Sequence, residues 1–313
     1  MLKIKDKYSL VIIGAGPAGL TASIYSSRYK IDNLIIGQAL GGLAFEAHKI
    51  CNFPSEQEIV GMELVNKMQK HAESLGAHLL IDKVIGVERQ NKLFKLTTLN
   101  NQQFLSQTIL LATGTVHRKM NLPNEEKFLG KGISYCATCD AMFYKNKTVA
   151  VIGGGNSAHT ASLYLAEVAD KVYQIYRGEK LRGETVWIDQ IIGHKKIKVI
   201  FNTQVKAISG KEKLEKIILD KPYHGQKELI LDGLFVEIGT LPQKALIKEL
   251  GLETEANGYI KVKTGQTTNQ PAIWAAGDIT NASDNFHQVI TACSEGAIAA
   301  QNIFKYLQEK NKI

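Results

Sequence analysis

The chain has few of the residues from which disulfide-stapled or membrane-spanning proteins are built. It has four cysteines among 313 residues, too few for a disulfide framework, and such sparse use is typical of the reducing cytoplasm. No run approaches the roughly 18 consecutive apolar residues that cross a bilayer. Hydrophobic residues make up 44% of the chain and charged residues 22%, which excludes a disordered or fibrous protein. We therefore expect a soluble cytoplasmic protein of about two globular domains.

The positive charge does not indicate nucleic-acid binding. Lysine and arginine number 38 against 30 acidic residues, a formal charge of +8. The basic clusters 194–198 and 211–216 are short, and Glu212 and Glu215 interrupt the second. No basic stripe interleaved with aromatic residues occurs, so a solvated surface is the better interpretation. The basic start of the chain and apolar residues 10–20 superficially resemble a signal peptide, but glycines break the apolar stretch.

One internal duplication organises the chain. Residues 11–25, VIIGAGPAGLTASIY, recur as residues 150–164, AVIGGGNSAHTASLY, at an offset of 139 residues. Each copy has a β-branched run, glycines at G-x-G-x-x-G/A spacing and a helical pattern of alanine and leucine. This strand, turn and helix unit binds the pyrophosphate of a dinucleotide, because small residues let the backbone approach the phosphates and the helix N-terminus attracts anions. The sequence predicts two dinucleotide sites, the first at Gly14, Gly16, Pro17, Ala18 and Gly19 and the second at Gly153, Gly155, Asn156, Ser157 and Ala158.

Two further segments look like strands that end in glycine turns. They are residues 108–114, ending in Gly114, and residues 271–278, ending in Gly277 and Asp278. An aspartate after such a turn can accept a hydrogen bond from a ribityl hydroxyl. We therefore expect an α/β fold of two Rossmann-like dinucleotide-binding domains, with the second inserted in the first. The first domain would be discontinuous, 1–115 and 243–313, and the second would span 116–242.

The chemical centre is the C-x-x-C pair Cys136 and Cys139, followed by Asp140. Such a pair can close a small disulfide ring or share a metal. A structural zinc site normally needs a second pair, and only Cys51 and Cys293 remain, which we expect to be buried small hydrophobes, so we predict no metal. A C-x-x-C beside βαβ patterning favours dithiol redox chemistry. Asp140 is a candidate acid or base, and a helix N-cap is its alternative role.

A dithiol does not accept hydride efficiently from a nicotinamide, and a flavin normally mediates. Two dinucleotide sites and one dithiol therefore suggest a relay from NAD(P)H through a flavin to the disulfide and on to an external substrate.

These motifs resemble, in order and spacing along essentially the whole chain, the low-molecular-weight thioredoxin reductases, homodimeric FAD enzymes of prokaryotes. The resemblance implies that thioredoxin or a thioredoxin-like protein is the partner and that the inserted domain rotates during turnover. It implies that Cys139 is the thiol next to the flavin, Cys136 attacks the disulfide of thioredoxin, and Asp140 is the general acid or base. It also implies an FAD site built from Gly14–Gly19, Gly37, Gly41, Gly42, Asn52, Thr113, Gly114, Gly277, Asp278, Gln288, Val289 and Ile290.

The main departure from the family pattern lies in the predicted nucleotide clamp. NADPH-using members carry His-Arg-Arg-x-x-x-Arg there, and this chain has Tyr176, Arg177, Gly178 and Arg182 at those positions. Arg177 and Arg182 would still hold a 2′-phosphate. Losing one charged contact costs on the order of 1.5–3 kcal/mol, roughly ten- to a hundredfold in affinity. Near the flavin, the family's Arg-Gln-Ala is His287-Gln288-Val289.

Several alternatives stay open from the sequence. We favour NADPH as the donor over NADH, and reduced ferredoxin or another donor would leave the second nucleotide site unused. A flavin dithiol oxidase that passes electrons to oxygen would use the same motifs. A redox-sensing or zinc-holding flavoprotein module is the non-catalytic alternative.

Overall fold

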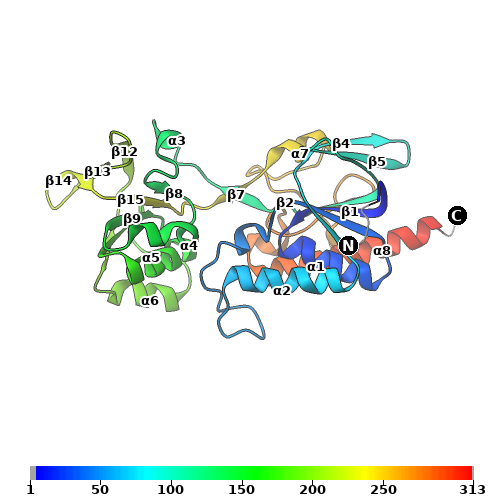
Figure 1. Cartoon of the computed structure of the whole chain (residues 1–313), viewed down its shortest axis with the longest axis horizontal. Coiled ribbons are helices and arrows are strands. Elements are labelled where there is room, and N and C mark those ends of the chain that lie inside the picture. The colour runs from blue at the N-terminus through cyan, green and yellow to red at the C-terminus, as the bar shows by residue number, and fades with distance from the viewer. Residues whose placement is uncertain (1–4, 312–313) are drawn as a thin grey trace. The chain divides into compact units, whose positions relative to one another are not determined.

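The structure is a computed structural model that describes residues 5–311. The chain divides into two compact units (Figure 1). The first unit consists of two stretches of the chain, one that ends at Val116 and one that begins at Leu241. The second unit spans His117–Thr240. In each unit, helices pack on a sheet whose central strands are parallel. The predicted fold class, two Rossmann-like units with the second inserted in the first, is confirmed.

The first unit is built on a seven-stranded mixed sheet of order β3-β2-β1-β6-β5-β4, with β17 pairing with β6. Strands β3, β2, β1, β6 and β17 are parallel, whereas β4 and β5 form antiparallel pairs. The central strand β1 has almost no polar residues after Ser9, because both faces of a parallel sheet are covered. The strands are β1 (Lys7–Ala15), β2 (Asn33–Leu40), β3 (His78–Ile81), β4 (Val84–Gln90), β5 (Leu93–Thr98), β6 (Gln103–Leu111) and β17 (Ile273–Ala275).

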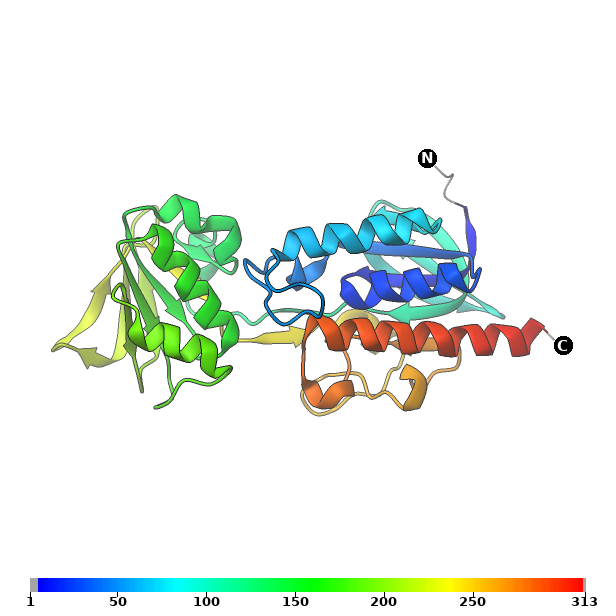
Figure 2. The ribbon, with the colours of Figure 1, turned by 90° about the horizontal axis from the view of Figure 1, so that it is seen from below.

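Three helices of this unit lie side by side, with α1 between α2 and α8 (Figure 2). Small residues allow α1 and α8 to approach closely: a Cβ at Gly296 would overlap the backbone carbonyl of Ala18. The helices are α1 (Pro17–Arg28), α2 (Gly61–Ser74), α7 (Lys244–Glu249) and α8 (Val289–Asn311), with 3-10 turns η1 (Gly42–Ala44), η3 (Thr264–Gln266) and η4 (Ala282–Asn285).

The second unit has a five-stranded parallel sheet of order β11-β10-β9-β15-β8 and a separate antiparallel sheet of order β12-β13-β14. Its parallel strands are β8 (Ile133–Ser134), β9 (Thr148–Ile152), β10 (Lys171–Ile175), β11 (Ile197–Ile200) and β15 (Gly233–Val236). Its antiparallel strands are β12 (Val205–Ser209), β13 (Lys216–Tyr223) and β14 (Gln226–Ile230). Its helices are α3 (Glu125–Phe128), α4 (Ala137–Asp140), η2 (Ala141–Tyr144), α5 (Asn156–Val168) and α6 (Thr185–Gly193).

The two chain crossings between the units form short strands that pair with each other, β7 (Thr115–His117) and β16 (Thr240–Pro242). The amide of Arg118 also donates to the carbonyl of Gly239 over 2.9 Å. The chain therefore leaves the first unit and returns to it along one narrow ribbon. None of the helices within residues 5–311 has the length and apolar character needed to cross a lipid bilayer.

Candidate active site

The first glycine turn lies at the carboxyl end of the parallel strands of the first unit. A Cβ at Gly14 would overlap the backbone carbonyl of Ala112, which follows β6, and one at Gly19 would overlap the carbonyl of Gly14. Gly37 on β2 packs as closely, because its Cβ would lie 2.6 Å from that of Ala15. Only glycine permits these contacts between strand ends and helix, which is the role the fingerprint predicts.

The other residues predicted to hold FAD follow neighbouring strands of the same sheet. Thr113 and Gly114 follow β6, Gly277 and Asp278 follow β17, and Gly41 and Gly42 follow β2. Because β2, β1, β6 and β17 are parallel neighbours, their carboxyl ends meet at one edge. The structure thus brings these residues to the same edge as the first glycine turn, although they come from three other parts of the chain.

Asn52 and Gln288 meet although 236 residues separate them in the sequence. The side-chain amide of Asn52 donates to Oε1 of Gln288 over 2.9 Å. Val289 and Ile290, the other predicted residues of this segment, begin helix α8. This contact joins the start of α8 to the loop before α2.

The geometry of this edge fits a bound dinucleotide. Helix α1 follows Gly16, which supplies no capping side chain, and its first turn has no acidic residue, so its first amides face no competing carboxylate there. The Nε2 atom of His287 is buried and has no hydrogen-bond partner among residues 5–311. Burial raises the pKa of Asp278 above that of an ordinary carboxyl; His287 opposes the shift, and Glu295 adds to it. Buried polar groups of this kind call for a ligand.

Glu295 on α8 supports this edge and was not predicted from the sequence. Its Oε2 atom accepts hydrogen bonds from the Gly277 amide over 2.8 Å and from the Thr280 hydroxyl over 3.0 Å. Its Oε1 atom accepts one from the Ser283 hydroxyl over 2.7 Å. This buried carboxylate fixes the turn that carries Asp278.

The second glycine turn, between β9 and α5, repeats the design of the first. A Cβ at Gly153 would overlap the carbonyl of Glu237, whereas one at Gly155 would meet nothing within 4 Å. Helix α5 also begins without a capping side chain and without an acidic residue in its first turn. The side-chain amide of Asn156 pairs with Glu184, through contacts of 3.0 Å to Oε1 and 2.8 Å from the Glu184 amide. Open space and uncapped amides fit the phosphates of a second nucleotide.

Arg177 and Arg182, the predicted clamp, lie on the segment that follows β10. Both side chains are exposed. The guanidinium carbon of Arg182 lies 5.8 Å from the ring centre of Tyr176. The segment that carries both arginines meets the second glycine turn at Arg182, whose amide donates to the carbonyl of Gly154 over 2.7 Å.

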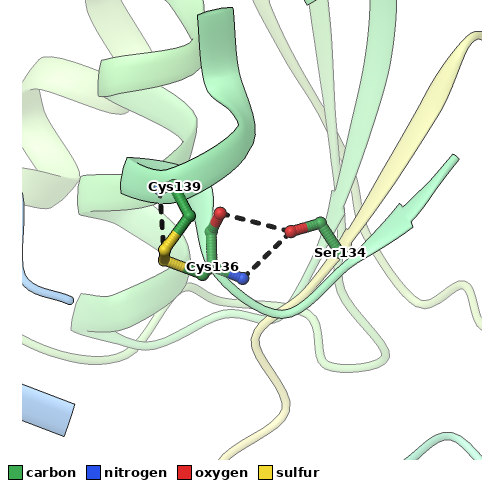
Figure 3. The surroundings of a disulfide bond; sticks show 3 residues. All are labelled: Ser134, Cys136 and Cys139. Atoms are coloured by element: carbon green, nitrogen blue, oxygen red, sulfur yellow. Dashed lines mark hydrogen bonds between the residues drawn. A yellow bond between two sulfur atoms is a disulfide. The ribbon is translucent and has the colours of Figure 1, made fainter. Parts of the chain in front are cut away.

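Cys136 and Cys139 form a disulfide, with their Cα atoms 5.3 Å apart. Cys136 immediately precedes the short helix α4, and its Sγ atom accepts a hydrogen bond from the Cys139 amide over 3.1 Å. Figure 3 shows the Ser134 hydroxyl between the backbone groups of Cys136: it accepts from the amide over 3.0 Å and donates to the carbonyl over 3.2 Å. Cys139 is exposed and Cys136 is half-buried.

The sequence predictions for Asp140 and for the two other cysteines have mixed outcomes. Asp140 lies at the end of α4 and its side chain makes no capping hydrogen bond with η2, so the structure does not support the N-cap alternative. The expectation that Cys51 is buried is wrong, because this residue lies exposed in the loop after Ile50, whereas Cys293 is half-buried. Within residues 5–311, no three His, Cys, Asp or Glu side chains are grouped to hold a metal ion.

The sequence and the fold are similar to those of known proteins. Residues 8–296 match the family model described as pyridine nucleotide-disulphide oxidoreductase. The thioredoxin reductase of Listeria innocua is 36% identical, over 96% of this chain and 94% of that protein. The structure of Lactococcus lactis thioredoxin reductase is 34% identical and has a TM-score of 0.91, covering 96% of this chain and 99% of that one.

A third relative bears on the electron donor. A ferredoxin-flavin thioredoxin reductase from Clostridium acetobutylicum is 31% identical, with a TM-score of 0.53 over 97% of this chain and 99% of that one. The three relatives share the disulfide reductase chemistry that their names give. The chain therefore belongs to the pyridine nucleotide-disulphide oxidoreductases, enzymes that use a pyridine nucleotide and a flavin, and within that family to the thioredoxin reductases.

Proposed function

We propose that the chain is a thioredoxin-disulfide reductase that takes electrons from NADPH and passes them through FAD and the Cys136–Cys139 pair to thioredoxin or a thioredoxin-like protein. The Cys136–Cys139 disulfide is the observation that carries the proposal, because it gives a chain with two dinucleotide-type glycine turns a group that exchanges with an external disulfide. Curated relatives of nearly equal length bear the same name. Bound FAD would relay two electrons from the nicotinamide to the dithiol.

The residues that would hold FAD are those at the strand-end edge of the first unit. The amides after Gly14 would face the phosphates of FAD, and Asp278 would accept a hydrogen bond from a hydroxyl of its ribityl chain. His287 would offer its buried nitrogen where the family carries arginine. NADPH would bind at Gly153, Gly155, Asn156, Ser157 and Ala158, with Arg177 and Arg182 holding the 2′-phosphate.

The dithiol chemistry follows from the hydrogen bonds around Cys136. In the reduced chain, the Cys139 amide that donates to Cys136 Sγ stabilises a thiolate there. This thiolate attacks one sulfur of the thioredoxin disulfide, so that a mixed disulfide forms as the thioredoxin bond breaks. Cys139 then attacks Cys136 Sγ, which restores the Cys136–Cys139 disulfide and releases thioredoxin with two thiols. Asp140, half-buried at the end of α4, would supply or take the accompanying protons.

The surface beside the dithiol supports a protein substrate. Met142 and Phe143 follow directly after it on η2, with 62% and 72% of their surface exposed. Large apolar side chains this exposed are typical of protein interaction sites. A homodimer and a cytoplasmic location complete the proposal, and light scattering of the purified chain tests the dimer.

The second glycine turn, open at Gly155, supports a nicotinamide donor, and the two exposed arginines that follow β10, Arg177 and Arg182, favour NADPH over NADH. The ferredoxin-flavin relative makes reduced ferredoxin the alternative donor. The deciding experiment mixes the flavin-loaded protein anaerobically with NADPH or NADH and follows flavin absorbance near 450 nm, about where oxidised flavins absorb. Fast bleaching by NADPH supports the proposal. A protein that dithionite bleaches but neither nucleotide does has a different donor.

The same assay, applied to cysteine variants, distinguishes the roles of Cys136 and Cys139. Cys136→Ser should abolish thioredoxin reduction while flavin bleaching by the donor persists. Cys139→Ser should also stop turnover, but it leaves Cys136 able to form a mixed disulfide that mass spectrometry detects. Thioredoxin turnover by Cys136→Ser at the wild-type rate would remove Cys136 from the mechanism. Rapid oxygen consumption with a dithiol and no nicotinamide would instead indicate an oxidase.

A further inference from the structure

A buried polar network lies beneath the second glycine turn. His159 on α5 is fully buried, with 0% of its surface exposed. Its Nδ1 atom lies 3.0 Å from Nε2 of Gln174, and its Nε2 atom lies 2.9 Å from the carbonyl oxygen of Arg182. Gln174, on β10, is also fully buried. Burying two polar side chains in a core is costly unless their polar atoms are hydrogen-bonded.

The network assigns the proton of His159. The Gln174 side-chain nitrogen also donates to the carbonyl of Gly153 over 3.1 Å, so it is the donor in both of its contacts. Its Oε1 atom has no partner within residues 5–311, which fits an amide oriented by its nitrogen. The Nδ1 atom of His159 therefore accepts, and Nε2–H donates to the carbonyl of Arg182.

Arg182 is consequently held on both sides of its backbone. Its amide donates to the carbonyl of Gly154 over 2.7 Å, and its carbonyl accepts from His159. Gly154 belongs to the glycine turn itself, so these two bonds tie the position of Arg182 to the turn. The Arg182 side chain is exposed, and its guanidinium carbon lies 5.8 Å from the centre of the Tyr176 ring. An arginine binds phosphate strongly only when its planar group is already oriented.

We propose that His159 is a positioning residue that makes the second site select nucleotides with a 2′-phosphate, because it fixes the backbone of Arg182. This inference rests on the nicotinamide donor of the proposed function. His159 does not touch the nucleotide; its effect passes through one carbonyl. The Asn156–Glu184 pair anchors the next part of the same segment at the surface, so loss of the His159 contact loosens Arg182 without releasing the whole loop.

The test compares two amide variants in the flavin-loaded protein. The side chain introduced by His159→Asn can still accept from Gln174 but is too short to reach the Arg182 carbonyl, whereas the one introduced by His159→Gln is long enough to reach it. The probes are 2′,5′-ADP, which carries the 2′-phosphate, and 5′-AMP, which does not, with binding measured by calorimetry on the oxidised protein. Ser162→Ala, also buried on α5, is the matched control for a disturbed helix core.

His159→Asn should weaken 2′,5′-ADP binding about tenfold and change 5′-AMP binding by less than about twofold. His159→Gln should stay within about threefold of wild type for both probes, and Ser162→Ala should match wild type. Steady-state kinetics should show the same pattern, with a higher KM for NADPH and an unchanged kcat. A residue with a merely structural role would weaken both probes together.

Two results overturn the inference. The first is that His159→Asn weakens the binding of 2′,5′-ADP and of 5′-AMP equally, or weakens neither. The second is that the Arg182→Gln protein prefers 2′,5′-ADP over 5′-AMP as strongly as the wild type does. This result does not depend on whether the His159→Asn protein folds. A wild-type protein that binds both probes equally also removes the inference but leaves a nicotinamide donor in place. A wild-type protein that binds neither probe and is not bleached by NADPH removes the donor of the proposed function as well.

Discussion

The ring of Tyr176 occupies the space that a side chain at position 178 would need. An ideal Cβ at Gly178 would lie 2.7 Å from Cε1 and 2.8 Å from Cζ of that ring. The opposite edge of the ring lies against Gly154, where a Cβ would be 2.6 Å from Cε2. The loss of the family's middle arginine at position 178 is therefore coupled to the tyrosine two residues earlier.

This coupling predicts that Gly178 cannot be changed alone. Gly178→Ala should lower the free energy of unfolding by about 1–3 kcal/mol, because the added methyl overpacks the ring. Gly193→Ala is the control, since a Cβ there would meet nothing within 4 Å. In a Tyr176→Ala background the same Gly178→Ala change should cost less than it does in the wild type, as denaturant unfolding of the single and double variants would reveal. Equal stability of the Gly178 and Gly193 variants would contradict the clash.

Glu295 should decide whether the chain retains its flavin. Glu295→Ala leaves the Gly277 amide and the Ser283 hydroxyl without their acceptor and removes one of the two acceptors of the Thr280 hydroxyl, and we expect a loss of about 2–4 kcal/mol in the free energy of unfolding. Glu295→Gln keeps one oxygen for Gly277 and should cost about 1 kcal/mol. Flavin content after purification should fall in the same order. Ser294→Ala, at the exposed neighbouring position, should change neither quantity.

The raised pKa of Asp278 gives a pH dependence of known sign. The folded, flavin-free chain holds this proton more tightly than the unfolded chain, so Asp278 lowers stability as pH rises from the ordinary carboxyl pKa through the raised value. Asp278→Asn should therefore gain stability relative to wild type with rising pH, while it binds FAD less well. Thermal unfolding of the flavin-free proteins across the acid range measures this difference.

Asp220 provides the control of opposite sign. The backbone amide of Gln204, at 2.8 Å, lowers the pKa of this carboxyl. Asp220 therefore adds stability above its unfolded pKa, and this contribution is lost as pH falls through the lowered value. Asp220→Asn should lose stability relative to wild type as pH rises. If the stability of Asp278→Asn and of Asp220→Asn, each relative to wild type, changed with pH in the same direction, the environment described for Asp278 would be wrong.

Phe143 should act on thioredoxin and not on the flavin. Phe143→Ala should raise the KM for thioredoxin about tenfold, because one exposed aromatic residue at the centre of an interface often supplies that much binding energy. Bleaching by NADPH and reduction of a small disulfide should stay at the wild-type rate. Ile230→Ala, on β14 of the same unit with 79% of the side chain exposed, is the control for a lost surface apolar group. An unchanged KM would place the thioredoxin contact elsewhere.

The sequence alone was enough to predict those parts of the candidate site whose residues lie close together along the chain. The glycine turns at Gly14 and Gly153 and the Cys136–Cys139 pair lie within a few residues, and their backbone geometry follows from residue type. The contact between Asn52 and Gln288 had no such signal, because it joins residues 236 positions apart. Only the resemblance connected them to one site.

The supporting residues were missed for a different reason. Glu295 lies between Ala292 and Ala299, at helical spacing on the buried face of α8, and a charged residue there is a signal that could have been noticed. His159 carries a weaker signal, because its function depends on Gln174 and on a carbonyl 23 residues away. Cys51 was predicted to be buried from residue type alone, and a loop position overrides that preference.

Because β7 pairs with β16, the inserted unit, residues 117–240, could be deleted or exchanged as one piece, and we call it the cassette. Adjacent paired strands lie about 5 Å apart, so the chain ends left by deleting residues 117–240 are already close enough for a short turn to join them. Every residue of the proposed FAD site lies outside the cassette, and both cysteines of the dithiol lie inside it. A gene could therefore acquire, lose or exchange the disulfide-reducing half of this protein without rebuilding the half that would hold the flavin.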